Sequence, residues 1–341
     1  MGAAKKDLSV SGPIDFVIIW VDGNDPEWRA QKALYDENAE TNANSEVRFR
    51  DWDNLRYWFR GVEKFAPWVN KIHFVTWGHI PKWLDTENPK LNIVKHTDYI
   101  PKEYLPTFSS HTIELNLHRI KGLSEQFVYF NDDMFLTAPT LPEDFFVNKK
   151  PCDTVALDCI CFNKDSAGFF NGADVSTIND HFSKGEAIKR DFKKWFSPKN
   201  GAKNILRTVL LLPWHWFPGF YYQHTPSSFL KSTFNEVWEK EYDVLNKTCL
   251  DKFRSTGNVN QWLMKFWQLA KGDFEVRRDS FAYCYHVKEY NYQQMLKDIA
   301  AQKHRMICIN DTAETFDFET KKQGVINAFE KLLPEKSSFE K

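Results

Sequence analysis

The sequence lacks a surplus of charge of either sign. Its 341 residues include 45 Lys and Arg against 46 Asp and Glu. Proteins that bind nucleic acid without sequence preference usually carry a clear basic surplus, because they must neutralise phosphates. The balance therefore argues against that class, and no nucleic-acid partner is expected.

Cysteine is scarce and is not arranged for metal binding. None of the six cysteines forms a Cys-x-x-Cys pair, and no histidine stands at zinc-finger spacing. This usage predicts reduced thiols in a cytoplasmic protein, with a structural disulfide or a zinc site as the alternatives. The cysteines are Cys152, Cys159, Cys161, Cys249, Cys284 and Cys308.

An apolar run long enough to span a bilayer is also missing. The most apolar stretch, 205–222, is interrupted by Arg207, Pro213, His215 and Pro218. Such a stretch predicts a buried helix and loop, with a position at a membrane surface as the alternative.

The beginning of the chain lacks the apolar segment of a signal peptide. Residues 1–13 read MGAAKKDLSVSGP, which is mostly polar. We therefore expect a disordered tail here and a protein that works in the cytoplasm.

What the sequence does contain is an alternation of strand and helix patterns. Short runs of β-branched and apolar residues predict strands, and segments with apolar residues three or four positions apart predict helices between them. This order predicts an α/β fold with a mostly parallel sheet. Strands are expected at 14–21, 71–76, 91–95 and 127–130, and helices at 26–38, 51–65 and 111–121.

The second half of the chain has a different pattern. Strand signals weaken between 150 and 225, and helices dominate from 226 onwards. We expect an α/β core over 14–150, a helical or irregular insertion or cap over 151–290, and a return to the core over 291–341. Helices are expected at 227–245, 258–269, 290–302 and 320–333, with a short apolar run at 305–309.

Three acidic turns directly follow predicted strands or apolar runs. They are Asp22-Gly23-Asn24-Asp25, Asn131-Asp132-Asp133 and Asn310-Asp311. Tight turns stabilised by Asx hydrogen bonds are one explanation. The other is a ligand site, because parallel sheets bind ligands beyond the carboxyl ends of their strands. Clustered carboxylates there favour a hard cation, Mg²⁺ or Mn²⁺, that contacts phosphate.

Two residues outside these turns are further candidates. His224 precedes a predicted helix, and Arg254 lies in the polar loop 253–257. A buried or surface imidazole and a solvent-exposed arginine are the ordinary explanations. The functional ones are a proton acceptor with a pKa near neutrality and a guanidinium that binds phosphate oxygens in pairs.

The blocks that contain these residues resemble, in this order, the Stealth family of hexose-1-phosphate transferases. The first block is IDFVIIWVDGNDPEW at 14–28. The second runs from about 50 to 146 and includes LRYWFRGVEKFAPWVNKIHFVTWGHIPKWL, LPTFSSHTIELNLHRIKGLSEQFVYFNDDMFL and PEDFF. The third spans QHTP at 223–226 and FRSTGNVNQ at 253–261, and the fourth is Cys308-Ile309-Asn310-Asp311.

The resemblance implies a fold and an activity. The fold is a GT-A-like, Rossmann-like domain that binds a nucleotide sugar. The activity moves a sugar 1-phosphate from a nucleotide diphosphate sugar, by family habit a UDP-sugar, to a hydroxyl of a glycan acceptor, and a nucleoside monophosphate leaves. The setting implied is bacterial capsular or cell-wall polysaccharide synthesis. The acceptor expected there is a growing glycan, either free or lipid-linked. The expected workplace is the inner face of the plasma membrane, with the enzyme itself cytoplasmic or peripheral.

The resemblance also implies a set of active-site residues. A metal on Asp132 and Asp311, with Asp133 and Asn310 beside them, would hold the diphosphate. Arg254 would bind phosphate oxygens, and either His224 or Asp22 would accept the proton of the acceptor hydroxyl. Further contacts to the donor are expected from Asp25, Arg56, Arg60 and Asn131.

Two other functions fit the same residues. A metal-dependent GT-A-type glycosyltransferase would break the bond to the anomeric carbon and release a nucleoside diphosphate. A non-catalytic sugar-binding module of an assembly complex would release nothing. The family resemblance favours phosphotransfer over glycosyl transfer. The reactive side chains at all five positions that it implies, Asp22, Asp132, His224, Arg254 and Asp311, argue against the non-catalytic module.

Overall fold

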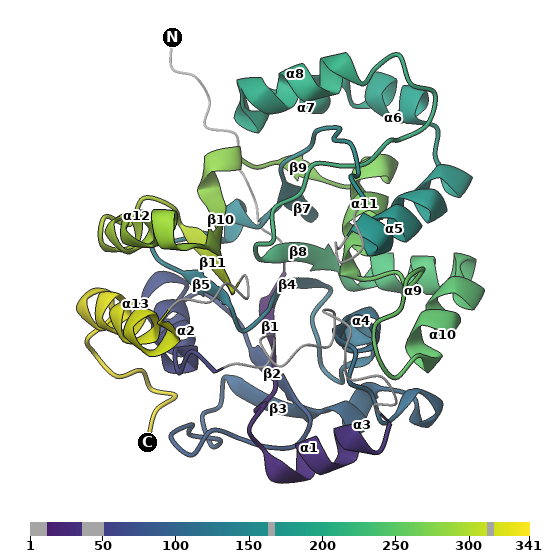
Figure 1. Ribbon diagram of the computed structural model, residues 1–341. Coiled ribbons are helices and arrows are strands. Elements are labelled where there is room, and N and C mark those ends of the chain that lie inside the picture. Colours follow the sequence, from purple (N-terminus) through teal and green to yellow (C-terminus); the bar gives the residue numbers. More distant parts are fainter. Residues whose placement is uncertain (1–11, 36–50, 163–167, 312–316) are drawn as a thin grey trace.

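The computed structural model describes residues 12–35, 51–162, 168–311 and 317–341. Most of the expected N-terminal tail lies outside these ranges. The chain forms a central sheet with helices on both faces and two small sheets beside it (Figure 1).

The central sheet has the strand order β3-β2-β1-β4-β8. The first four strands run parallel, and β8 is antiparallel to β4. The prediction of an α/β fold with a mostly parallel sheet is therefore confirmed. The strands are β1 (Ile14–Trp20), β2 (Ile72–Thr76), β3 (Leu91–Lys95), β4 (Gln126–Phe130) and β8 (Ser227–Leu230).

The order of these strands locates a crevice. The chain adds strands on one side of β1 first and then crosses to its other side with β4. At such a switch point the two following loops diverge, so that a ligand can enter beyond the carboxyl ends of the strands. The loops that leave β1 and β4 here are the acidic turns 22–25 and 131–133.

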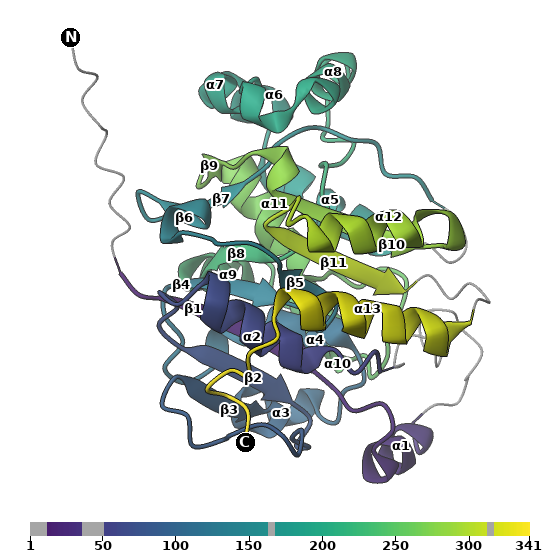
Figure 2. The same cartoon turned by 90° about the vertical axis from the view of Figure 1, so that its left-hand side faces the viewer.

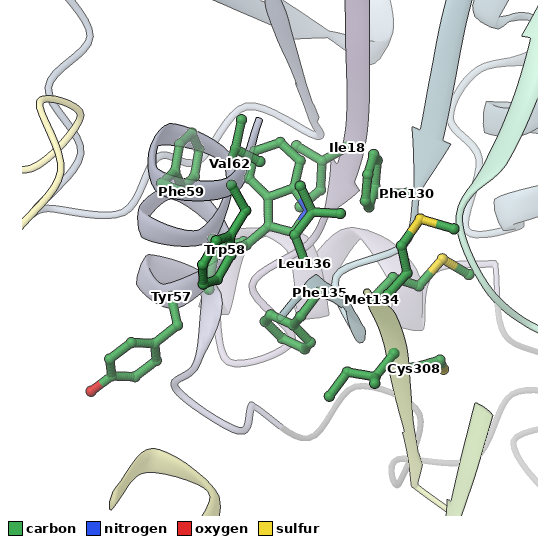
Figure 3. Packing of buried hydrophobic residues seen from close by; sticks show 14 of the residues in the cluster. Ile18, Tyr57, Trp58, Phe59, Val62, Phe130, Met134, Phe135, Leu136 and Cys308 are labelled. Carbon is green, nitrogen blue, oxygen red and sulfur yellow. The ribbon is translucent and has the colours of Figure 1, made fainter. Parts of the chain in front are cut away.

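Alternation along β1 divides the core into two parts. Phe16 and Ile18 point to one face, and Val17 points to the other. On the first face, Trp58 of α2 packs against Phe130, with 5.4 Å between the ring centroids (Figure 3). The helices on this face are α2 (Leu55–Phe65), α12 (Glu289–Ala300) and α13 (Phe318–Leu332).

The opposite face of the sheet is covered mainly by the middle of the chain. Phe127 and Phe229, from β4 and β8, lie in this second core. The helices that cover it are α3 (His96–Tyr99), α4 (Ser110–Leu115), α5 (Gly168–His181), α9 (Lys231–Lys240), α10 (Tyr242–Leu250) and α11 (Gln261–Lys271). The remaining helices are α1 (Pro26–Ala33), α6 (Lys184–Arg190), α7 (Phe192–Trp195) and α8 (Ala202–Leu210).

Two small sheets link distant parts of the sequence. One has the order β10-β11-β5, and the other has the order β6-β7-β9. Their strands are β5 (Met134–Leu136), β10 (Ala282–Val287), β11 (Met306–Asp311), β6 (Phe146–Val147), β7 (Lys150–Asp153) and β9 (Glu275–Val276). Figure 2 shows the first of these sheets next to α12 and α13.

The segment 151–290 is more than a helical insertion. It supplies β8 to the central sheet and β10 to the first small sheet. The prediction of one helix over 227–245 is wrong at its start. Residues Ser227–Leu230 instead extend along β4, where Phe229 is fully buried beside Phe127. Burial of that side chain outweighs the weak helical pattern of these four residues.

The apolar stretch 205–222 is exposed over much of its length. Phe217 and Phe220 are buried, as expected, but the residues before them are not. The prediction of a buried helix and loop is therefore wrong for the first part of the stretch. The exposed side chains are Leu206, Val209, Leu210, Leu212, Trp214 and Trp216, between 42% and 62% accessible. Within the described residues, no helix is long and apolar enough to cross a membrane.

A buried ion pair attaches the C-terminal residues to α2. The guanidinium of Arg60 is 6% exposed and donates to both carboxylate oxygens of Glu340, at 2.8 and 2.9 Å. It also donates to the carbonyl of Leu333 and to Glu330. The pair thereby links the helix α2 of the first core to the chain that follows α13.

Removing one partner of this pair should destabilise the fold. We expect Glu340→Gln to lower the free energy of unfolding by about 3 kcal/mol, because a buried guanidinium would lose its bidentate partner. Urea unfolding measures the change, with Glu335→Gln, at an exposed position, as the control. A loss below about 0.5 kcal/mol, the range of ordinary surface changes, would show that the pair does not anchor the C-terminal residues.

Candidate active site

Strand pairing brings three segments together at the turn Asn131–Asp133. The end of β4 lies opposite the start of β8, with Tyr129 paired to Ser227, so the residues just before β8 reach the turn. On the other side, β5 pairs with β11 in antiparallel register, and the amide of Ile309 donates to the carbonyl of Asp133 at 2.8 Å. The segments of His224 and of Asn310-Asp311 therefore both border the predicted metal turn.

His224 contacts the turn directly. Its Nε2 atom lies 3.5 Å from Oδ2 of Asp133 and 3.1 Å from Nδ2 of Asn131. The thiol of Cys308 donates to the same Asp133 oxygen at 3.2 Å. Tyr129 in turn holds the amide of Asn131 through its hydroxyl. These contacts fix the imidazole against the carboxylate, an arrangement that orients a proton-transferring histidine.

The carboxylate changes the protonation of this histidine. Burial alone would lower the pKa of His224, but the charge and hydrogen bond of Asp133 outweigh it and raise the pKa to about 9. Without a cation at the site, this shift favours the protonated form of His224 at neutral pH. The expectation of a near-neutral pKa is corrected, because the sequence does not reveal the carboxylate beside the ring.

A group of carboxylates forms around Asp132. Desolvation within the surrounding protein, together with the charges of Asp133 and Asp51, raises the pKa of Asp132 to about 7. Asp51 also faces the charge of Asp22, and desolvation with these neighbours raises the pKa of Asp51. Three segments far apart in the sequence thus place mutually repelling carboxylates at the carboxyl ends of β1 and β4.

These residues fit a divalent cation. The Oδ1 atom of Asp133 is buried and has no hydrogen-bond partner among the described residues. A cation would supply that partner and would offset the repulsion that raises the pKa of Asp132. Asp133, His224 and Cys308 also offer one ligand atom each within 4.8 Å of one another. The oxygen ligands suit Mg²⁺ or Mn²⁺, which prefer carboxylates to thiols.

Arg254 lies on the other side of His224. It follows α10 and donates to the hydroxyl of Ser110, the first residue of α4, at 2.7 Å. The buried Glu114, one turn further along α4, faces the charges of both Arg254 and His224. Burial raises the pKa of Glu114, which the guanidinium of Arg254 opposes. The protonation state of Glu114 therefore affects the electrostatic surroundings of both Arg254 and His224.

The loop after β1 is held in place by its own side chains. Asp22 accepts from the amide of Asn24 at 2.9 Å, and its own amide donates to Nε2 of His79 at 2.7 Å. Asp25 caps α1 by accepting from the amide of Trp28. Asp25 was expected to contact the donor, but here its first role is structural. Asp22 remains at the edge of the carboxylate group.

The two predicted arginines of α2 have different surroundings. Arg60 is buried in the ion pair with Glu340, so its guanidinium is not available to a nucleotide and does not enter the proposed site. Arg56 is partly exposed, 4.0 Å from Asp53 and 5.7 Å from the ring centroid of Trp83. It lies in the first turn of α2, the end of the helix that follows Asp51.

The fourth block borders the site through the thiol of Cys308 and the backbone of Ile309. Asn310 contacts Nδ1 of His286 at 3.2 Å, on the neighbouring strand β10. Asp311 ends β11, and its side chain is partly buried.

Two neighbours of the site were missed in the sequence. There, Asp51 is only the first residue of the predicted helix 51–65, and Glu114 is only a position within the predicted helix 111–121.

Known families match two of the four sequence blocks. The model of Stealth protein conserved region 1 matches residues 12–40, and that of conserved region 2 matches residues 48–153. The similarity continues along the rest of the chain. The capsular polysaccharide phosphotransferase WcwK of Streptococcus pneumoniae is 44% identical over 330 residues, which cover 96% of this chain and 98% of that protein. The chain belongs to the Stealth family.

Other similar Stealth proteins are bacterial and are named as phosphotransferases. The receptor polysaccharide phosphotransferase WefC of Streptococcus gordonii is 44% identical and covers 96% of this chain and 98% of that protein. The exopolysaccharide phosphotransferase cps2G of Lactiplantibacillus plantarum is 39% identical and covers 98% of each. The predicted family is confirmed, and the predicted enzyme class is the class that these names state.

Similarity to solved structures is distant. The galactosyltransferase LgtC, in complex with donor and acceptor sugar analogues, covers 92% of this chain at 8% identity, with a TM-score of 0.40. A likeness at this level does not bear on activity.

The raised pKa of His224 gives a pH-dependent signal. In metal-free protein, we expect the imidazole to titrate near pH 9, and near or below pH 6.5 in Asp133→Asn. The folded-state pKa lies above the unfolded value, so this pair stabilises the fold fully below about pH 6.5. The contribution is then lost as the pH rises to about 9.

NMR titration of the ring protons measures both midpoints. The control is Asp243→Asn, which removes the same charge at an exposed position of α10. Addition of Mg²⁺ should lower the midpoint of the wild-type protein, because the cation offsets the charge of Asp133. An unchanged midpoint in Asp133→Asn would refute the pairing.

Proposed function

We propose that this Stealth protein transfers a sugar 1-phosphate from a nucleotide diphosphate sugar to a hydroxyl of a glycan acceptor. The donor is a UDP-linked hexose or N-acetylhexosamine, and the process is capsular or exopolysaccharide synthesis. One observation carries the proposal. His224 contacts Asp133 in the turn that follows β4, Asp132 lies in the same turn, and the buried Glu114 faces the charges of both His224 and Arg254. The phosphotransferase names of the relatives support it.

The reaction breaks one bond and forms another at a single phosphorus atom. The acceptor oxygen attacks the phosphorus that carries the sugar, and the bond from that phosphorus to the bridging diphosphate oxygen breaks. The nucleoside monophosphate leaves with the bonding electrons, and the product is a phosphodiester. The protein must place the two reactants in line and offset charge on the phosphoryl oxygens.

Each of these side chains has a role that its surroundings allow. Arg254 can bind two phosphoryl oxygens at once through its planar guanidinium. His224, held by Asp133 at 3.5 Å, exchanges a proton with the acceptor hydroxyl. As an imidazolium it must first lose its proton, and Asp22 is the alternative base. A divalent cation held by Asp132 and Asp133, when bound, would neutralise diphosphate charge, with Asn310-Asp311 adjacent.

The identity of the released nucleotide tests this function. We expect UMP from a UDP-sugar, glycan acceptor and Mg²⁺ or Mn²⁺, detected by chromatography. UDP would instead indicate glycosyl transfer, and no release despite donor binding would indicate a binding module. His224→Gln and Asp132→Asn should lower the rate at least about 100-fold, as loss of a proton-transferring group or of charge stabilisation does.

The controls separate site effects from folding. Glu103→Gln removes a carboxylate at an exposed position and should retain the wild-type rate. EDTA should abolish transfer, and added Mn²⁺ should restore it. Full activity in EDTA would refute the cation, and full activity of His224→Gln would remove the histidine from the reaction.

We also infer that the protein binds an anionic membrane surface through α6–α8 and the loop that follows. Figures 1 and 2 both place these helices at the end of the molecule away from β3. The six exposed side chains between Leu206 and Trp216 include two tryptophans, which suit the boundary between water and lipid. Scattered single apolar residues are ordinary, but a group this dense marks an interaction site.

Charge in the same segment selects the partner. Residues 184–216 contain eight Lys and Arg against two Asp and Glu, a net charge of +6, whereas the whole chain carries −1. Exposed members such as Lys189, Lys193 and Lys203 are free to face a surface. Each basic residue near an anionic leaflet contributes about 1 kcal/mol, which favours lipid over another protein as the partner.

Vesicle sedimentation tests this surface. We expect binding to vesicles that contain phosphatidylglycerol and little binding to pure phosphatidylcholine, with a steep loss at high salt. Trp214→Ala combined with Trp216→Ala should weaken binding at least about tenfold, whereas Tyr290→Ala, 84% exposed on α12, should not. Association of the protein with itself through the same tryptophans, without lipid binding, would refute the proposal.

A further inference from the structure

A second polar pocket lies directly behind His224. Its empty volume is about 290 Å³, and it opens to solvent. The pocket is bounded by the end of β7, the chain on both sides of His224, α11 and the start of β10. The lining residues that the argument uses are Asp153, Gln223, Thr225, Lys265, Arg277 and Asp279.

Arg277 is the unusual member of this pocket. Its side chain is 8% exposed, and its Nη1 atom is buried without a hydrogen-bond partner among the described residues. Its guanidinium instead faces the ring of Phe281, with 5.2 Å between its central carbon and the ring centroid. A buried guanidinium nitrogen without a hydrogen-bond partner is costly, so proteins rarely keep one unless a ligand completes it.

The two carboxylates of the pocket already interact with neighbouring side chains. Asp153 pairs with the buried Lys265 at 2.8 Å. Asp279 accepts from Nε2 of Gln223 at 3.1 Å. Lys265 faces the positive charge of Arg277, which adds to the cost of both. With the exposed Arg278 at the rim, the pocket holds three cations against two paired carboxylates. The pocket therefore carries an excess of positive charge, which a bound anion would neutralise.

The pocket adjoins the segment that carries His224. Gln223 and Thr225, the two chain neighbours of His224, both line it.

We propose that this pocket binds a phosphate group of the acceptor, with Arg277 as its principal contact. This proposal rests on the proposed transfer reaction, because that reaction determines what an acceptor looks like. Each transfer leaves a phosphodiester in the product, so an extended acceptor carries phosphates of its own. A diphosphate that joins the glycan to a lipid has the same oxygens and the same need for a guanidinium.

Binding of small phosphates tests the pocket without any reaction. We expect dimethyl phosphate and methyl diphosphate to bind the metal-free wild-type protein in calorimetric or NMR titrations, and to bind Arg277→Gln at least about tenfold more weakly. Lys297→Gln, an exposed change of the same charge on α12, should bind like the wild type. Equal binding by all three proteins would overturn the proposal.

Stability provides a second readout of the same variant. Without phosphate, Arg277→Gln should unfold at the wild-type temperature or above it, because the change removes an unpaired buried charge. Phosphate should then stabilise the wild type and not the variant. A marked loss of stability in Arg277→Gln would instead show that the guanidinium has a structural partner, and would overturn the proposal.

Kinetics then identify the source of the phosphate. Three acceptors with the same terminal sugar are compared: a neutral glycan, a glycan with an internal phosphodiester and a glycan on a prenyl diphosphate. Arg277→Gln should raise KM about 10- to 100-fold for one or both phosphate-bearing acceptors, with kcat and the KM of the donor unchanged. Equal effects on all three acceptors, or none, would overturn the proposal.

The two sets of results are separable. If no nucleotide sugar yields a nucleoside monophosphate, the transfer reaction fails while phosphate binding by Arg277 stands. If transfer proceeds and phosphate binding does not depend on Arg277, the pocket fails alone.

Discussion

Strand pairing on both sides of the turn Asn131–Asp133 is the constraint on which the site depends. The turn connects β4 of the central sheet to β5 of a small sheet, so it belongs to both. Ladder hydrogen bonds in either sheet fix its backbone, and each sheet then adds a strand from a distant part of the chain. The register of these strand pairs, rather than contacts within loops, therefore places His224 and Asn310-Asp311 next to the carboxylates.

Charge balance in the site is incomplete without a ligand. Carboxylates from three segments repel one another around Asp132, and a carboxylate raises the pKa of His224 to about 9. Behind that histidine, Arg277 is buried, and its Nη1 atom has no hydrogen-bond partner among the described residues. The carboxylate repulsion around Asp132 and the unsatisfied Nη1 atom of Arg277 reduce the stability of the empty protein, and the large apolar cores on both faces of the sheet must offset these two costs. A cation and phosphate groups would turn each of these costs into binding energy.

The sequence was sufficient for the fold class and the family, whereas the residues of the candidate site stay predictions. Buried parallel strands such as Ile14–Trp20 can be recognised in the sequence as apolar runs, and the acidic turns that follow them can be recognised by their Asp and Asn residues. It was insufficient where contacts between distant segments decide the outcome. Ser227–Leu230 form a strand because they pair with the edge of β4. Arg60 is buried because it pairs with Glu340, which lies 280 positions further along the chain. The pKa of His224 and the charge around Asp51 depend on neighbours that no local pattern encodes.

In the proposed membrane-bound state, the short connection between the exposed tryptophans and His224 would set a length for the acceptor. His224 lies eight positions after Trp216, and a fully extended chain of eight residues spans at most about 28 Å. With the tryptophans in a lipid surface, the reacting hydroxyl stands within roughly that height of the bilayer. Short glycans on a lipid carrier meet this height directly, and longer ones must bend back towards the membrane. The enzyme would then favour early, short intermediates of polysaccharide synthesis as acceptors.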